Sequence, residues 1–191
     1  MYKSLNPHIE ILIIKRRNMT NENENNVEKV IEFKQRSISL TVALIGVTAA
    51  LYTALGYTFQ PISFLGIQFR VAELIVGMCI LFPFEGLIGN VLGVFFVNLT
   101  SPLGLIDLNS CWVNVPALLC IVYFKDKRIL KYLGGILYAI IISFYVAVIL
   151  YIVLLLPLWL MFIQVLIAEV ILVTLGIILF EGIKKGLNFE V

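Results

Sequence analysis

Four ionisable residues occur where the chain is otherwise apolar: Arg70, Glu73, Asp107 and Glu169. Glu169 is the only charged residue between positions 132 and 180. Placing such a side chain in a membrane-spanning helix costs about 2.5 to 3.5 kcal/mol on insertion scales, so it normally faces the bundle interior or a water-filled cavity. Two carboxylates and a guanidinium at such places could recognise a polar ligand through charge-assisted hydrogen bonds.

Each of these residues also has a structural interpretation. Arg70 and Glu73 are three residues apart at the start of a helix, so they could form an interfacial salt bridge. Asp107 follows a Ser-Pro-Leu-Gly stretch and could cap a helix. Glu169 lies too deep to reach water, which favours a functional or pore-facing role over an internal hydrogen bond.

Further polar candidates lie on the neighbouring segments. Asn98 can donate to a carbonyl group and accept from an amine, and Trp112 and Asn114 stand at the head of the next helix. Asparagines often only hold helices together, so each is weak evidence for a site.

Several kinds of chemistry are excluded. The three cysteines lack a C-x-x-C spacing and the only histidine, His8, lies in a polar segment, so we expect no metal site and no histidine-based catalysis. There is no phosphate loop of the G-x-x-x-x-G-K-[ST] type. The net charge of +2 does not indicate nucleic-acid binding. We expect no enzyme and no cofactor.

The elements that position the candidates are membrane-spanning helices. Hydrophobic residues make up 61% of the 191 and charged residues 14%, which predicts an all-α integral membrane bundle. We expect residues 1–37 to be a disordered polar tail without a cleaved signal, 38–185 to be a domain of six transmembrane helices, and 186–191 to be a short tail. The expected apolar segments are Ile38–Phe59, Val71–Phe82, Gly86–Leu99, Leu103–Phe124 with an irregular entry, and Tyr132–Phe180 divided at Pro157.

The basic residues predict the orientation. With six spans, 13 of the 14 Lys and Arg residues lie on one side, and Arg70 alone lies opposite. Positive charge marks the cytoplasmic side, so both termini should be cytoplasmic, in the cell membrane.

Small residues repeat at helical spacing on two segments. Gly46, Ala50 and Ala54 form a stripe on the first helix, and Gly89 and Gly93 form a G-x-x-x-G. Such stripes allow close helix approach, more commonly within a bundle than to another subunit.

Three segments carry a family resemblance. They read I-Q-F-R-V-A-E at 67–73, G-L-I-G at 86–89 and N-L-T-S-P-L-G-L-I-D at 98–107. Together they resemble the queuosine-precursor transporter (QueT) family, the substrate-binding S components of energy-coupling-factor (ECF) importers. The chain departs from the family after Asp107, where L-N-S-C-W replaces a run of small residues.

The resemblance implies a six-helix subunit that captures a 7-deazaguanine, such as the 7-aminomethyl compound or queuine, with no cofactor. Its partners would be a transmembrane coupling subunit, docked on Gly46, Ala50 and Ala54, and separate ATPases. The substrate residues would come from the candidates above: Glu73, Asp107, Asn98, Arg70, Trp112, Asn114 and Glu169. A carboxylate can accept two neighbouring N–H groups of a guanine edge, a second can accept a cationic aminomethyl group, and an indole can stack on the ring.

Two alternatives remain open. The chain could be an S component for another vitamin, since only the pocket would differ. It could also be a non-transporting membrane scaffold subunit, whose buried polar groups would then pair with one another.

Overall fold

The computed structural model describes residues 38–64 and 68–186, and every regular element among them is helical. The predicted tail at 1–37 lies outside these residues, and so does the predicted tail at 186–191 except for Gly186, which ends α7. In chain order the elements are a helix at Ile38–Thr58, α2 (Gln60–Phe64), the 3₁₀ helix η1 (Val71–Gly77), α3 (Met78–Leu81), α4 (Pro83–Asn98), the 3₁₀ helix η2 (Gly104–Asn109), α5 (Ser110–Phe124), α6 (Leu130–Leu154) and α7 (Leu158–Gly186).

Four helical stretches of the described chain are long and apolar enough to cross a membrane. They are Ile38–Thr58, Gly104–Phe124, Leu130–Leu154 and Leu158–Gly186. The predicted first span and the irregular entry before α5 are therefore confirmed. The predicted second and third spans are shorter helical stretches, Val71–Leu81 and Pro83–Asn98.

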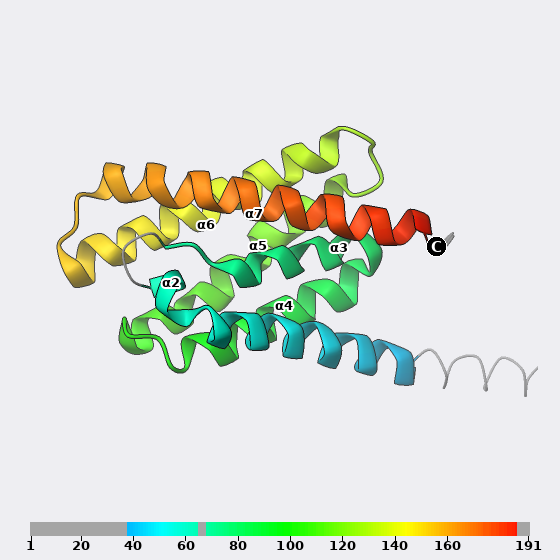
Figure 1. Ribbon diagram of the computed structural model, residues 1–191, viewed down its shortest axis with the longest axis horizontal. Coiled ribbons are helices and arrows are strands. Elements are labelled where there is room, and N and C mark those ends of the chain that lie inside the picture. Colours follow the sequence, from blue (N-terminus) through cyan, green and yellow to red (C-terminus); the bar gives the residue numbers. More distant parts are fainter. Residues whose placement is uncertain (1–37, 65–67, 187–191) are drawn as a thin grey trace, which may run out of the picture. The chain divides into compact units, whose positions relative to one another are not determined.

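Helices α6 and α7 form a hairpin and lie side by side along their length (Figure 1). Leu155 ends α6 in the left-handed conformation, with φ 55° and ψ 28°, and Pro157 immediately precedes α7. Proline fixes φ and restricts the residue before it, so one long helix cannot continue through this point. The predicted break at Pro157 is confirmed, and it brings both halves into the core.

The η1–α3–α4 segment corrects one detail of the predicted boundaries. The predicted apolar segments Val71–Phe82 and Gly86–Leu99 leave residues 83–85 between them as a turn, but the break falls at Phe82, whose φ of −127° and ψ of 86° are not helical. Pro83 then occupies the first turn of α4, where its missing N–H group costs nothing. Glu85 consequently belongs to α4 and not to a loop.

The backbones of η1 and α7 lie in direct contact. A Cβ atom built on Gly77 would lie 2.3 Å from the carbonyl oxygen of Gly176, and one on Gly176 would lie 2.4 Å from that of Leu74. Only glycine permits this backbone contact. It places η1 directly against α7, so Glu73 and Glu169, on these two elements, come near each other.

The two small-residue stripes have different surroundings. Cβ atoms on Gly89 and Gly93 would lie 2.5 Å from Thr48 and 2.6 Å from Tyr52, so the G-x-x-x-G of α4 packs inside the bundle. The three residues of the other stripe, Gly46, Ala50 and Ala54, are instead exposed on the first helix.

We predict that Gly176→Ala destabilises the protein, because the added methyl group overlaps a backbone carbonyl that cannot rotate away. Overpacking of this kind costs about 1 to 3 kcal/mol or more. Gly182→Ala makes the same change on the same helix at a position with nothing within 4 Å, and it should leave the unfolding temperature in detergent unchanged. Equal melting of the two variants would contradict the close contact.

Candidate functional site

Glu73 is fully buried, and two tyrosines from distant helices hold its carboxylate. Tyr52, on the first helix, donates its hydroxyl to Oε1 at 2.7 Å. Tyr138, on α6, donates to Oε2 at 2.6 Å. A carboxylate offers about four acceptor sites, so both oxygens can still accept further N–H groups. The tyrosines therefore fix the orientation of Glu73 and leave it able to bind a ligand.

Asn114 joins this group from α5. Its Oδ1 lies 3.2 Å from the hydroxyl oxygen of Tyr138, and its side chain is buried. One hydroxyl proton is shared between two acceptors, Asn114 and Glu73, so the position of Tyr138 depends on both. Four elements thus meet at one buried hydroxyl–carboxylate cluster: the first helix, η1, α5 and α6.

A second polar group, formed by Tyr145 and the η2 segment with Asp107, lies about two turns along α6 from Tyr138. The hydroxyl of Tyr145 donates to the carbonyl oxygen of Ile106, next to Asp107 in η2, at 3.3 Å. Seven helical residues separate Tyr138 from Tyr145, a rise of about 10 Å on the same face. Asp107 is 1% exposed, and its Oδ2 has no hydrogen-bond partner among the described residues.

Asn98 closes the turn that carries Asp107. Its Nδ2 donates to the backbone carbonyl of Asp107 at 3.1 Å and to the hydroxyl of Ser110. Asp107 is therefore not placed by capping a helix with its side chain, since neither η2 nor α5 has a side-chain cap. The carboxylate remains available to a ligand.

Arg70 interacts electrostatically with both polar groups, the one around Glu73 and the one around Asp107. It is 8% exposed and interacts with the charges of Asp107, Glu169 and Glu73, with Asp107 the strongest of the three. Arg70 is the N-cap residue of η1, with φ −84° and ψ 84°, and its carbonyl oxygen accepts from the backbone N–H of Glu73 at 2.9 Å, so the two residues are i, i+3 neighbours in the first turn. The Glu73 carboxylate is oriented by the two tyrosines.

Glu169 is fully buried on α7, and neither of its carboxylate oxygens has a hydrogen-bond partner among the described residues. Its strongest electrostatic neighbour is Glu73, followed by Arg70. Within 38–64 and 68–186, no hydrogen bond gives Glu169 the internal partner that a purely structural role would need. An unpaired carboxylate at this depth is costly, and a bound cation or donor would relieve that cost.

The cavity beside these residues is very small. It is lined by Tyr52, Gly56, Ser63, Arg70, Ala72, Val97 and Asn98, and its volume is about 10 Å³. That is room for at most one water molecule. Small-molecule sites usually measure about 300 to 1,000 Å³, so this cavity is much smaller than a site that holds a heterocycle.

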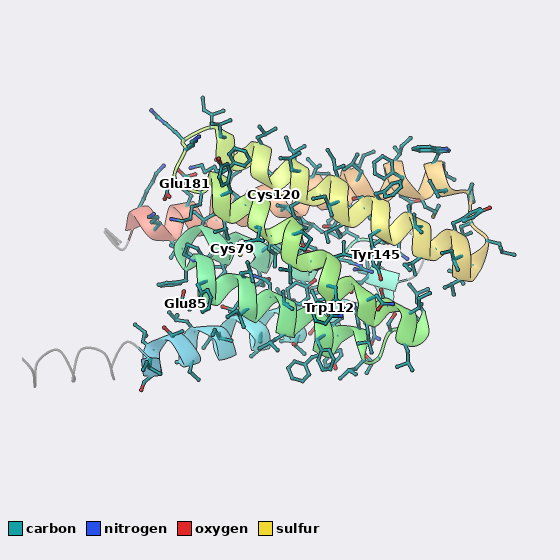
Figure 2. The ribbon with its side chains drawn as sticks, turned by 180° about the vertical axis from the view of Figure 1, so that it is seen from behind. Cys79, Glu85, Trp112, Cys120, Tyr145 and Glu181 are labelled. Atoms are coloured by element: carbon teal, nitrogen blue, oxygen red, sulfur yellow. The ribbon has the colours of Figure 1, made fainter. Side chains whose placement is uncertain are left out.

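The structure brings six of the seven predicted site residues into or beside this cluster. The exception is Trp112, which is 79% exposed on α5 (Figure 2), away from the buried carboxylates. Sequence analysis missed Tyr52, Tyr138 and Tyr145. The seven-residue spacing of Tyr138 and Tyr145 on one predicted helix is the signal that could have found two of them.

Comparison with known proteins gives the family. A family model described as QueT transporter matches residues 42–185, which is most of the chain and includes every residue of the cluster. The chain belongs to the QueT transporter family. No curated protein and no solved structure matches it.

Membership establishes the general role of the molecule. A QueT transporter is a membrane transport protein and not an enzyme, and the resemblance noted in the sequence is confirmed. The four apolar helices agree with a place in the membrane.

We predict that Tyr138→Phe lowers the stability of this QueT protein by about 1 to 3 kcal/mol, because Glu73 and Asn114 both lose a buried hydrogen-bond partner. Tyr123→Phe removes the same hydroxyl from a side chain that is 75% exposed and serves as the control. Denaturant unfolding in detergent measures both variants. A Tyr138→Phe protein as stable as the control would show that this hydroxyl does not hold the cluster.

Proposed function

We propose that the protein is the six-helix S component of an ECF importer and that it binds a 7-deazaguanine queuosine precursor. The observation that carries the proposal is the buried, tyrosine-held carboxylate of Glu73, with Glu169 and Asp107 unsatisfied nearby. The family match supports a role in transport, and the substrate and the partners are part of the proposal.

Glu73 suits the guanine-like edge of the ligand. Such an edge presents two neighbouring N–H donors, and a carboxylate can accept both at once. Because Tyr52 and Tyr138 each use one acceptor site of one oxygen, sites on both oxygens remain for the ligand. Asn98, which lines the cavity, would contact the carbonyl side of the ring.

The surplus of carboxylates suits a cationic ligand. Arg70 carries one positive charge against the three acidic groups Glu73, Asp107 and Glu169, so the cluster has a formal charge of −2. An aminomethyl group on the deazapurine is cationic, and it would pair with Glu169 or Asp107. The unpaired oxygens of Glu169 favour it as the partner.

The same oxygens argue against a scaffold subunit. In a scaffold subunit, buried polar groups should form hydrogen bonds with one another, because an unsatisfied group costs stability and no ligand would compensate for it. Glu169 and one oxygen of Asp107 remain without hydrogen-bond partners among the described residues. A site that is completed by a ligand explains them.

Transport by an S component needs a coupling subunit and separate ATPases as partners. The stripe of Gly46, Ala50 and Ala54 is exposed, and a Cβ atom on Gly46 would meet nothing within 4 Å, so another helix could approach it closely. The opposite face of this helix carries Tyr52. We place both termini on the cytoplasmic side, where the basic loop 125–131 would also lie.

Calorimetry on two variants tests the substrate assignment. We expect Glu73→Gln to weaken binding of 7-aminomethyl-7-deazaguanine, 7-cyano-7-deazaguanine and queuine alike, by about 1 to 3 kcal/mol, since an amide donor would face a ligand donor. Glu169→Gln should weaken binding of the cationic aminomethyl compound and spare the neutral cyano compound.

Each variant is the control for the other, and unfolding temperatures verify that both fold. Full binding by a folded Glu73→Gln protein would remove Glu73 from the site. Failure of the wild-type protein to bind any of the three compounds would reject the substrate class.

We predict that Ala50→Trp impairs uptake by cells while leaving ligand binding within about twofold, because the indole would block docking on an exposed face. Ile171→Trp, on an exposed position of α7 outside the stripe, should affect neither. Loss of binding together with uptake in Ala50→Trp would assign the stripe to packing within the bundle.

A further inference from the structure

A second cavity lies far from the carboxylate cluster, where the amino end of α6 meets the carboxyl end of α7. It is a groove of about 480 Å³, lined by Arg128, Ile129, Lys131, Tyr132, Ile178, Glu181, Gly182 and Lys185. Nothing in the proposed transport site uses these residues. Figure 2 labels Glu181 on this part of α7.

The groove is built around one carboxylate with several donors. Glu181 accepts from Lys131 at 2.6 Å, from Lys185 at 3.1 Å and from the hydroxyl of Tyr132 at 3.3 Å. The Lys131 side chain is only 8% exposed, so this ion pair is a fixed part of the wall. Glu181 is thus already satisfied within the protein.

Positive charge remains after this pairing. Three basic side chains line the groove against one carboxylate, which gives a net charge of +2. Arg128 makes no ion pair within the described residues, and the Lys185 side chain is 77% exposed. The amino end of α6 begins here as well, with Ile129 as its N-cap and no side-chain cap. Arginine and lysine side chains beside the positive end of the helix dipole together favour a bound oxyanion.

Apolar surface continues directly from the charged wall. Ile129 is 79% exposed and Ile178 is 51% exposed, and both line the groove. A Cβ atom on Gly182 would meet nothing within 4 Å, so the groove is open above this residue. The groove therefore offers a charged end and an apolar side at the termini of two membrane-spanning helices, where the headgroup region of a bilayer begins.

We propose that this groove binds a phospholipid with an anionic headgroup. The phosphate lies between Arg128 and Lys185, and the glycerol and first acyl carbons lie on Ile129 and Ile178. Basic pockets between spanning helices on the cytoplasmic side suit such headgroups. A free phosphate would satisfy the charges alone and would leave the exposed isoleucines uncovered.

Native mass spectrometry of the full chain in detergent tests the proposal. We expect the wild-type protein to retain phosphatidylglycerol in preference to phosphatidylcholine. The Arg128→Gln/Lys185→Gln double variant should lose binding by about tenfold or more, since each basic group near a lipid surface contributes about 1 kcal/mol. Excess inorganic phosphate should not displace the lipid.

Two further variants make the test specific. Lys125→Gln/Lys127→Gln also removes two positive charges, from the loop that carries Arg128 but outside the groove, and should bind normally. Gly182→Leu keeps every charge but fills the groove, and it should lose binding as the charge variant does. If the double variant does not fold, lipid binding by Gly182→Leu tests the proposal: lost binding supports the groove as the lipid site, and unchanged binding contradicts it.

Three results would overturn the proposal. They are equal retention of the two lipids, equal loss in the Lys125/Lys127 control, and displacement by inorganic phosphate, which would mark a site for free anions. None of these measurements involves deazapurine binding. A negative result would therefore reject the lipid site without bearing on the proposed transport function.

Discussion

The backbone contact between Gly77 and Gly176 is the constraint on which the site depends. It lets a 3₁₀ helix lie against α7 at a separation that any side chain would prevent. Gly77 follows Glu73 by four residues and Gly176 follows Glu169 by seven, so the contact fixes two carboxylates near each other. Tyr52 and Tyr138 then hold one of these carboxylates, and the other is left without a hydrogen bond.

The sequence predicts well those features whose energetics are local. Burial of Glu73, Asp107 and Glu169 follows from the cost of placing a charge in lipid, which any apolar stretch reveals. The break before α7 follows in the same way from the restricted backbone of Pro157. The helical class of the fold needs only composition and span length.

Features that depend on distant contacts could not be predicted. Tyr52 and Tyr138 are 86 residues apart, and nothing in either segment shows that both reach Glu73. The spacing of Arg70 and Glu73 does show that they share the first turn of η1, but it does not show that two tyrosines hold the Glu73 carboxylate. Trp112 has the right chemistry for stacking, yet the rotation of α5 turns it outward.

The helical pair in the middle of the chain has a consequence for the surrounding lipid. Helix α4, with 16 residues, measures about 24 Å, and η1 with α3 measures about 20 Å, whereas a bilayer core is about 30 Å thick. In the proposed six-span arrangement, this hydrophobic mismatch would make the bilayer thin locally or the pair tilt less than its neighbours, at a cost of fractions of a kcal/mol per ångström. Thin membranes should therefore accommodate the protein at lower cost than thick ones, so membrane thickness itself becomes a variable that acts on the element carrying Glu73.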